Sequence, residues 1–463
     1  MRWPNWPEVR PLVPALSTLI LIGLAPHISG EPRFVQAGLL FLSFQGLLCD
    51  RRAGEHPPRS SYVLVVAGLL LVPGMPYYFS DDALRHAFDG SQLLRGNDVY
   101  RFAPLELGAS PGLPLPNHAQ LATIYLPFTQ IQAVLGALFS ERYGYSIVYA
   151  TLCVLLIVGT TRRLSPGGAI GSFRGVLLAP AFWLMASGRH ADLQGALIVT
   201  WLLAGWLRKS QPAKSVCALE GLLCAALVGI KPEGAIWCAG LLGLHMRKWK
   251  ANPGGSTTAV CHLLGLAYGL AIQSVFALFV MFPRMESVSS FLDTARLFAD
   301  WFVAYNPIIG LLEGADIDSR PEMMHGYRLG ILAVVVIAFL CVPVALRFGR
   351  VARGIQRSDW WLMLLIGALA FSVFARGSWN PWYFAWFFPL GLLAPSRVAR
   401  VASHALPLFY LPVADLRAGG DWDMRLFYVS IASYFFAWIL LTAWRRRGSV
   451  RAWKREGRSA SEK

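Results

Sequence analysis

Two adjacent carboxylates mark the most chemically suggestive stretch of the sequence. Asp81 and Asp82 directly follow an apolar run, and Arg85 and His86 come about one helical turn later. Neighbouring carboxylates repel each other, so one should have a raised pKa and both should attract a cation or hydrogen-bond donor. A carboxylate tuned in this way can act as a general base. The alternative is a pair of solvated acids that cap a helix beginning at Ala83.

A second polar cluster, residues 188–194, lies between two apolar runs. It contains Arg189, His190 and Asp192. Ionisable side chains that face one space at a helix junction suit a polar headgroup. The alternative is that Asp192 only caps the following helix.

A lysine interrupts what would otherwise be a long apolar stretch, residues 216–245. Lys231 is followed by Pro232 and Glu233, and Glu220 lies earlier in the same stretch. Charges in such a stretch are costly unless they are paired or face water. Lys231 is therefore a candidate phosphate ligand. The alternative is a structural ion pair between Lys231 and Glu233 or Glu220.

An arginine next to aromatic residues forms the fourth cluster. Arg376 precedes Trp382 and Tyr383 near the start of another apolar run. Aromatic residues at membrane interfaces usually act as anchors. A guanidinium beside them suits phosphate oxygens because its N–H groups form a planar fork.

The composition indicates that these clusters belong to a membrane protein. The chain has 463 residues, of which 55% are hydrophobic and only 15% charged, with a mean hydropathy of +0.48; globular proteins carry roughly 25% charged residues. About 13–14 apolar runs approach the ~20 residues that a transmembrane helix needs. The candidate spans are 11–29, 34–49, 61–79, 144–161, 173–187, 191–207, 215–230, 234–246, 258–282, 326–346, 359–375, 381–395, 403–415 and 426–444.

Charge distribution predicts the topology of this all-α, polytopic domain, residues 1–444. Cytoplasmic loops are enriched in Lys and Arg, and the basic connections fall on the side of the N-terminus if 119–139 is a re-entrant or interfacial helix. Both termini are then cytoplasmic, including a basic tail at 445–463, and the long connections 80–120 and 283–325 are external. The net charge of +16 is thus an orientation signal with affinity for membrane lipids, and it does not indicate nucleic acid.

The first long connection resembles a known family. It is similar to the first external loop of bacterial GT-C glycosyltransferases that use polyprenol-phosphate sugars, with the pattern Asp-Asp-x-x-Arg, Asp-Gly, Gly-x-Asn, Asn-His and Thr-Ile-Tyr. The matching positions are Asp81, Asp82, Arg85, Asp89, Gly90, Gly96, Asn97, Tyr100, Pro104, Asn117, His118, Thr123, Ile124, Tyr125, Pro127 and Gln130. The chain departs from the pattern at His86, Asp98-Val99, Ala119 and Leu126; these departures leave the acids intact, and the resemblance does not define the sugar.

The resemblance implies an inner-membrane enzyme with an external active site. It would transfer a sugar, such as mannose or another hexose, from polyprenyl phosphate to a glycan, glycolipid or protein acceptor, with inversion and with Asp82 or Asp81 as general base. The expected donor-phosphate ligands are Arg85, Lys231, Arg376, Arg189 and His118. The expected sugar or acceptor ligands are Asp192, His190, Asn117, Tyr125, Trp382 and Tyr383.

Two alternatives remain open at this point. The chain could be a transporter or flippase of lipid-linked sugars, although transporters tend to have repeated halves and midplane charges. It could also be a degenerate relative that only assembles with partners. The sequence indicates no definite cofactor; a divalent cation at Asp81 and Asp82 is an option, although two carboxylates alone do not make a metal site. The seven cysteines lie in apolar runs, which indicates small buried side chains.

Overall fold

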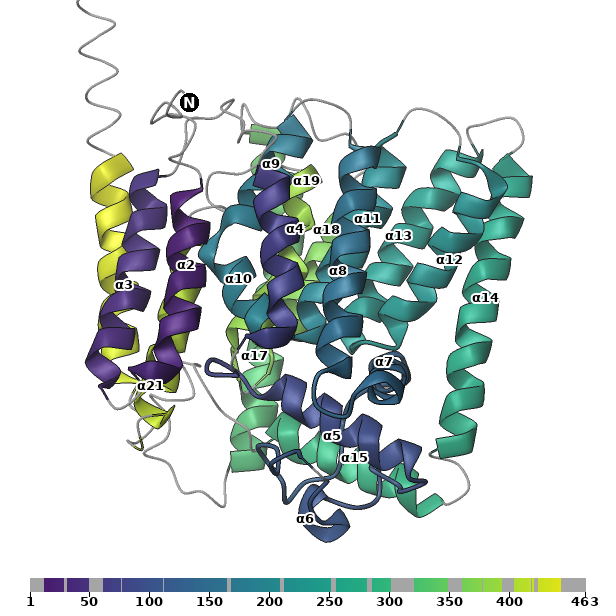
Figure 1. The fold of residues 1–463 in the computed structure, drawn as a ribbon. Helices are drawn as coiled ribbons and strands as arrows, with labels where there is room; N and C mark the ends of the chain where they lie inside the picture. The colour runs from purple at the N-terminus through teal and green to yellow at the C-terminus, as the bar shows by residue number, and fades with distance from the viewer. Residues whose placement is uncertain are drawn as a thin grey trace, which may run out of the picture.

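The computed structural model confirms an all-helical chain over the residues that it describes (Figure 1). These residues are 12–28, 31–49, 61–75, 77–110, 112–164, 168–208, 212–250, 255–280, 285–300, 320–348, 360–376, 378–393, 404–417, 419 and 424–442. The expected basic tail at 445–463 and most of the basic connections lie outside these ranges. Three described helices are long and apolar enough to cross a membrane by length and composition: Gly144–Arg163, Gly255–Val280 and Arg425–Thr442.

The longer helices stand side by side and share one general direction (Figure 1). On one side are α2 (Val13–Leu24), α3 (Pro32–Cys49) and the final helix, Arg425–Thr442. The rest of the assembly contains α4 (Ser61–Leu71), α8 (Gly144–Arg163), α11 (Ala191–Leu207), α12 (Lys214–Val228), α13 (Pro232–Lys250), α14 (Gly255–Val280), α17 (Arg320–Phe348) and α18 (Trp360–Phe374).

Prolines divide several of the apolar runs into shorter pieces. Because proline lacks an N–H and clashes with the preceding helical turn, it is favoured at the start of a helix and disfavoured in the interior. The predicted span 173–187 is accordingly two helices, α9 (Gly168–Leu178) and α10 (Pro180–Ser187). The predicted span 381–395 is mainly a 3-10 helix, η6 (Pro381–Phe387), followed by the short α19 (Leu390–Leu393). The predicted span 403–415 likewise contains a 3-10 helix, η7 (Leu406–Tyr410), followed by α21 (Leu411–Arg417).

A layer of helices covers one end of the long helices (Figure 1). It contains α5 (Asp82–Leu94), α6 (Pro104–Leu107), α7 (Pro127–Phe139) and α15 (Met285–Asp300). The predicted re-entrant segment 119–139 becomes helical at Pro127, and α7 lies alongside α5 across the ends of the long helices. Its position relative to a membrane stays a prediction.

The two long connections meet in this layer. Arg101 pairs with Glu286 at 2.5 Å, and the rings of Tyr100 and Phe291 are 5.8 Å apart. The layer is also tied to the long helices, because the backbone N–H of Phe128 donates to the Gly229 carbonyl at the α12–α13 junction (3.0 Å). The carbonyl thereby satisfies one of the N–H groups that the first turn of α7 leaves unpaired.

Candidate functional site

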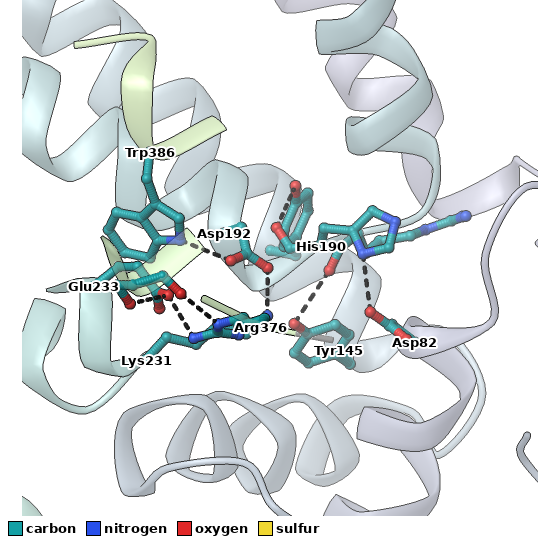
Figure 2. A network of polar contacts seen from close by, with 11 residues as sticks. Asp82, Tyr145, His190, Asp192, Lys231, Glu233, Arg376 and Trp386 are labelled. Atoms are coloured by element: carbon teal, nitrogen blue, oxygen red, sulfur yellow. Dashed lines mark hydrogen bonds and ion pairs between the residues drawn. The ribbon is translucent and has the colours of Figure 1, made fainter. Parts of the chain in front are cut away.

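Four segments that are distant in sequence bring polar side chains together where α5 meets the long helices (Figure 2). They are the start of α5, the α10–α11 junction, the α12–α13 junction and the segment 376–386. All four clusters that the sequence singled out contribute to one network, the first of them through Asp82. The Trp382 and Tyr383 rings, 6.1 Å apart, join the His190 side of this network to Lys231 and Arg376. The connected residues are Asp82, His190, Asp192, Lys231, Glu233, Arg376, Trp382, Tyr383 and Trp386.

Asp82 contacts a histidine whose orientation is fixed by packing. Its Oδ2 lies 2.9 Å from Nδ1 of the fully buried His190. The His190 ring stacks on Trp382, with ring centroids 4.1 Å apart and an interplanar angle of 16°. Gly188 leaves room for this ring, since a Cβ there would lie 2.7 Å from His190 Nε2. The Asp82 side chain is still 29% exposed. The contact with His190 therefore fixes its position and leaves part of the carboxylate accessible.

The two adjacent carboxylates have different environments. Burial tends to raise the pKa of Asp82, but the charge and hydrogen bond of His190, helped by His86 and Lys231, hold this pKa at about 2. Burial raises the pKa of Asp81; Arg417 opposes that effect and the charge of Asp82 adds to it. Asp82 is therefore the carboxylate that is firmly ionised, while Asp81 is the more easily protonated of the pair.

The lowered pKa of Asp82 predicts a pH-dependent contribution of this side chain to the stability of the fold. The folded-state pKa of about 2 lies below the ordinary value of 3.8, so the stabilisation is present above pH 3.8 and is lost as the pH falls through about 2. The shift corresponds to about 2 kcal/mol. Asp82→Asn should therefore lower the melting temperature clearly at pH 5 and much less near pH 2, measured by thermal unfolding of the purified protein. An equal loss at both pH values would contradict this assignment.

Lys231 pairs with an acid on another helix. Its Nζ lies 2.6 Å from Oδ2 of Asp192, and the other oxygen of Asp192 accepts a hydrogen bond from Trp386 Nε1 at 2.7 Å. The Trp386 indole reaches Asp192 because Gly195, one turn along α11, has no Cβ to collide with the ring. An ammonium group has three donors, so the pair with Asp192 does not saturate Lys231.

Arg376 forms a second ion pair beside the first. Its guanidinium binds the buried Glu233, which also accepts a hydrogen bond from Ser372 Oγ at 2.7 Å. The Tyr383 ring faces both cations: Lys231 Nζ is 4.8 Å and the Arg376 guanidinium carbon 4.5 Å from its centroid. An aromatic face attracts cations, so Tyr383 holds two positive side chains close together.

The structure corrects the alternative pairings and the capping roles. Lys231 binds Asp192, whereas Glu233 binds Arg376 and Glu220 binds Arg163. Asp81 is at the N-cap of α5 but makes no side-chain capping hydrogen bond. His190 is the N-cap residue of α11, and Asp192 faces Lys231 and Trp386.

Other residues from the first long connection mainly hold the covering layer together. Arg85, expected as a phosphate ligand, is buried and binds Asp89 at 2.9 Å and the Leu121 carbonyl at 3.0 Å. The Tyr125 ring lies 4.1 Å from that of His86, within the same layer. Two donors of Arg85 are thus engaged within the layer, and its role as a phosphate ligand stays a prediction.

His118 and Asn117 lie at the edge of the layer. His118 is close enough to Asp81 for its charge to lower the pKa of that carboxyl, and its ring contacts Phe298 of α15. The Oδ1 of the exposed Asn117 accepts a hydrogen bond from the His118 backbone N–H at 2.9 Å. His118 is thus beside the carboxylates, whereas Asn117 contributes to the local turn.

Arg189 is buried inside the protein and does not face the network as a phosphate ligand would. Its backbone has a φ of 51°, and its guanidinium donates to the carbonyls of Ser187, Val72 and Met75, the last at 2.7 Å. Removing a buried charged donor leaves these acceptors unsatisfied. We expect Arg189→Gln to reduce the free energy of unfolding by about 1–3 kcal/mol. The folded fraction should keep its affinity for a polyprenyl-phosphate sugar, the ligand that the resemblance implies. A binding isotherm normalised to folded protein checks this.

The sequence did not single out Arg417, Glu233 or Trp386 as site residues. Arg417, at the end of α21, lies 3.7 Å from Asp81 and donates to the Tyr78 carbonyl. Nothing in its local sequence points to Asp81, so only the fold reveals the contact. The presence of Glu233 in an apolar stretch was a signal in the sequence, but it suggested Lys231 as the partner of Glu233, and the structure pairs Glu233 with Arg376.

The arrangement of Asp81 and Asp82 does not favour a shared divalent cation. Each carboxylate faces a different basic side chain, Arg417 or His190. A hard cation needs several oxygen ligands, and the side chains whose charges act on the pair include the bases Arg417, His190, His118 and Lys231, which disfavour a further positive charge there. Comparisons of the chain with protein-family models, curated proteins and solved structures gave no match.

Proposed function

We propose that the protein is a membrane glycosyltransferase of the GT-C type, acting on a polyprenyl-phosphate sugar at the external face of a bacterial inner membrane. The observation that carries the proposal is the network in Figure 2: it contains a partly exposed, ionised carboxylate, Asp82, whose pKa the charge of Lys231 helps to lower, and Lys231 shares one aromatic ring with a second cation, Arg376. Inverting transfer from a lipid phosphate needs these two kinds of group. The resemblance of residues 81–130 to the GT-C external loop supports the same reaction.

In the proposed reaction, Asp82 is the base because it is the ionised and partly exposed carboxylate of the pair, although its pKa is lowered and that of Asp81 is the one raised. Asp82 accepts the proton of an acceptor hydroxyl as that oxygen attacks the anomeric carbon. The bond from this carbon to the phosphate oxygen breaks, and polyprenyl phosphate leaves with the electron pair. Lys231 and Arg376 stabilise the negative charge that develops on the leaving phosphate. Asp192 and Glu233 keep these cations in position before the donor arrives, and His190 orients Asp82.

The exposed apolar surface supports a membrane location. Along α14 only 11% of the most apolar window is buried, and Tyr268 and Phe279 are 67% and 79% exposed. Soluble proteins rarely expose continuous apolar surface of this kind. A polyprenyl donor also partitions into the bilayer, which brings it to a site at the ends of these helices.

The proposal is tested with purified protein in liposomes that contain labelled polyprenyl-phosphate mannose. Glycolipid, polysaccharide and peptide acceptors are supplied outside, and product formation is compared between wild type, Asp81→Asn and Asp82→Asn. Acceptor-dependent transfer by the wild type, lost in Asp82→Asn with donor binding retained, is expected. Transbilayer movement of the donor that survives both substitutions, without transfer, would instead identify a flippase.

A further inference from the structure

A second group of ionisable side chains lies at the other end of α12, α13 and α14. Glu220, His245 and His262 come from these three helices and are 2%, 5% and 1% exposed. Glu220 precedes the α12–α13 junction by the stretch up to Val228, which spans about 12 Å of helix. The group is therefore separate from the network around Asp82.

Close packing of α12 against α14 creates this group. A Cβ on Gly221 would collide with the His262 carbonyl, and one on Gly265 would collide with the Ala218 carbonyl. Gly265 and Gly269 are spaced as in the small-xxx-small pattern that lets helix backbones approach closely. Because the backbones nearly touch, the side chains of Glu220 and His262 converge at the edge of the contact.

The three side chains have the geometry of a small ligand set. One potential ligand atom from each lies within 4.8 Å of the others. The rings of His245 and His262 are 5.1 Å apart with an interplanar angle of 37°. Among the residues that the structure describes, both ring nitrogens of the buried His262 lack a hydrogen-bond partner. An imidazole in such a position is costly unless a ligand occupies it.

We propose that Glu220, His245 and His262 bind a transition-metal dication, Zn²⁺ in the first instance. Two imidazoles and one carboxylate form an established zinc ligand set, with a fourth position for water. Arg163 binds Glu220 Oε1 at 2.8 Å, but a carboxylate can accept further interactions. Arg163 then acts as the outer partner that orients the ligating carboxylate, and the metal joins α12, α13 and α14 at this end.

The test uses full-length protein purified through a tag without histidine and stripped with a chelator. Titration with Zn²⁺ alone, followed by removal of free metal, should leave about one equivalent per chain by mass spectrometry. Saturation should raise the melting temperature by several degrees, because the metal binds only the folded state. Co²⁺ should give the visible absorption of a low-coordinate site with nitrogen and oxygen ligands.

Matched variants decide between a specific site and surface binding. His262→Leu and His262→Gln should each weaken Zn²⁺ binding at least tenfold, whereas His404→Leu, outside these helices, should not. Two replacements are used at His262 so that a folding defect in one of them does not decide the result. The Co²⁺ spectrum of the wild type tests the site without any substitution. Less than stoichiometric metal in the wild type, or equal affinity in the His262 variants, would overturn the proposal.

Discussion

Asp82→Asn is expected to reduce sugar transfer by a factor of about 10² to 10⁴, the usual contribution of a positioned general base. The amide has nearly the same shape as the carboxylate but cannot take the proton of the acceptor hydroxyl. Lys231 and Arg376 are unchanged, so the affinity for polyprenyl-phosphate mannose should stay within a few-fold of wild type. Initial rates and donor binding are measured on the same liposome preparation, per folded protein.

Asp81→Asn is the matched control for this substitution. Asp81 belongs to the same pair but faces Arg417, so its replacement should affect transfer much less. A larger loss of rate in Asp81→Asn than in Asp82→Asn would move the base to Asp81. Its raised pKa would then place the acid limb of the rate profile at a higher pH than the pKa of about 2 held by Asp82.

Lys231→Met is expected to cost about 3–5 kcal/mol in unfolding free energy, the range for removing one partner of a buried ion pair. The Asp192 side chain is only 1% exposed, so it would be left with the single hydrogen bond from Trp386. Denaturant or thermal unfolding in detergent measures this loss. A change of less than 1 kcal/mol would mean that water replaces Lys231 and that the pair is not an important structural contact.

The double variant Lys231→Met with Asp192→Asn separates stability from donor binding. An amide at position 192 can still accept the hydrogen bond from Trp386 and leaves no buried charge without a partner, so much of the stability should return. Affinity for the polyprenyl-phosphate donor should not return, since the cation is still missing. If donor affinity recovers together with stability, Lys231 has only a structural role.

Much of the local organisation was predictable from the sequence because it depends on neighbouring residues. The long apolar runs indicate helices, and the polar clusters at 81–86, 188–194, 231–233 and 376–383 mark their ends. Pro232 follows Lys231 at the point where α12 and α13 separate. The prediction of a single helix over 173–187 was wrong, because the run is divided between α9 and α10. Pro180 was a local signal for this break.

The partners of the charged residues were decided by the tertiary structure alone. Sequence proximity suggested Glu233 for Lys231, but the approach of α11 to the α12–α13 junction gives Asp192 instead, 39 residues away. Arg376 reaches Glu233 across 143 residues. An ion pair forms only where packed helices bring two side chains within a few ångströms, and composition and spacing do not encode that distance. The sequence by itself therefore determined which residues could do chemistry, and helix packing decided which of them meet.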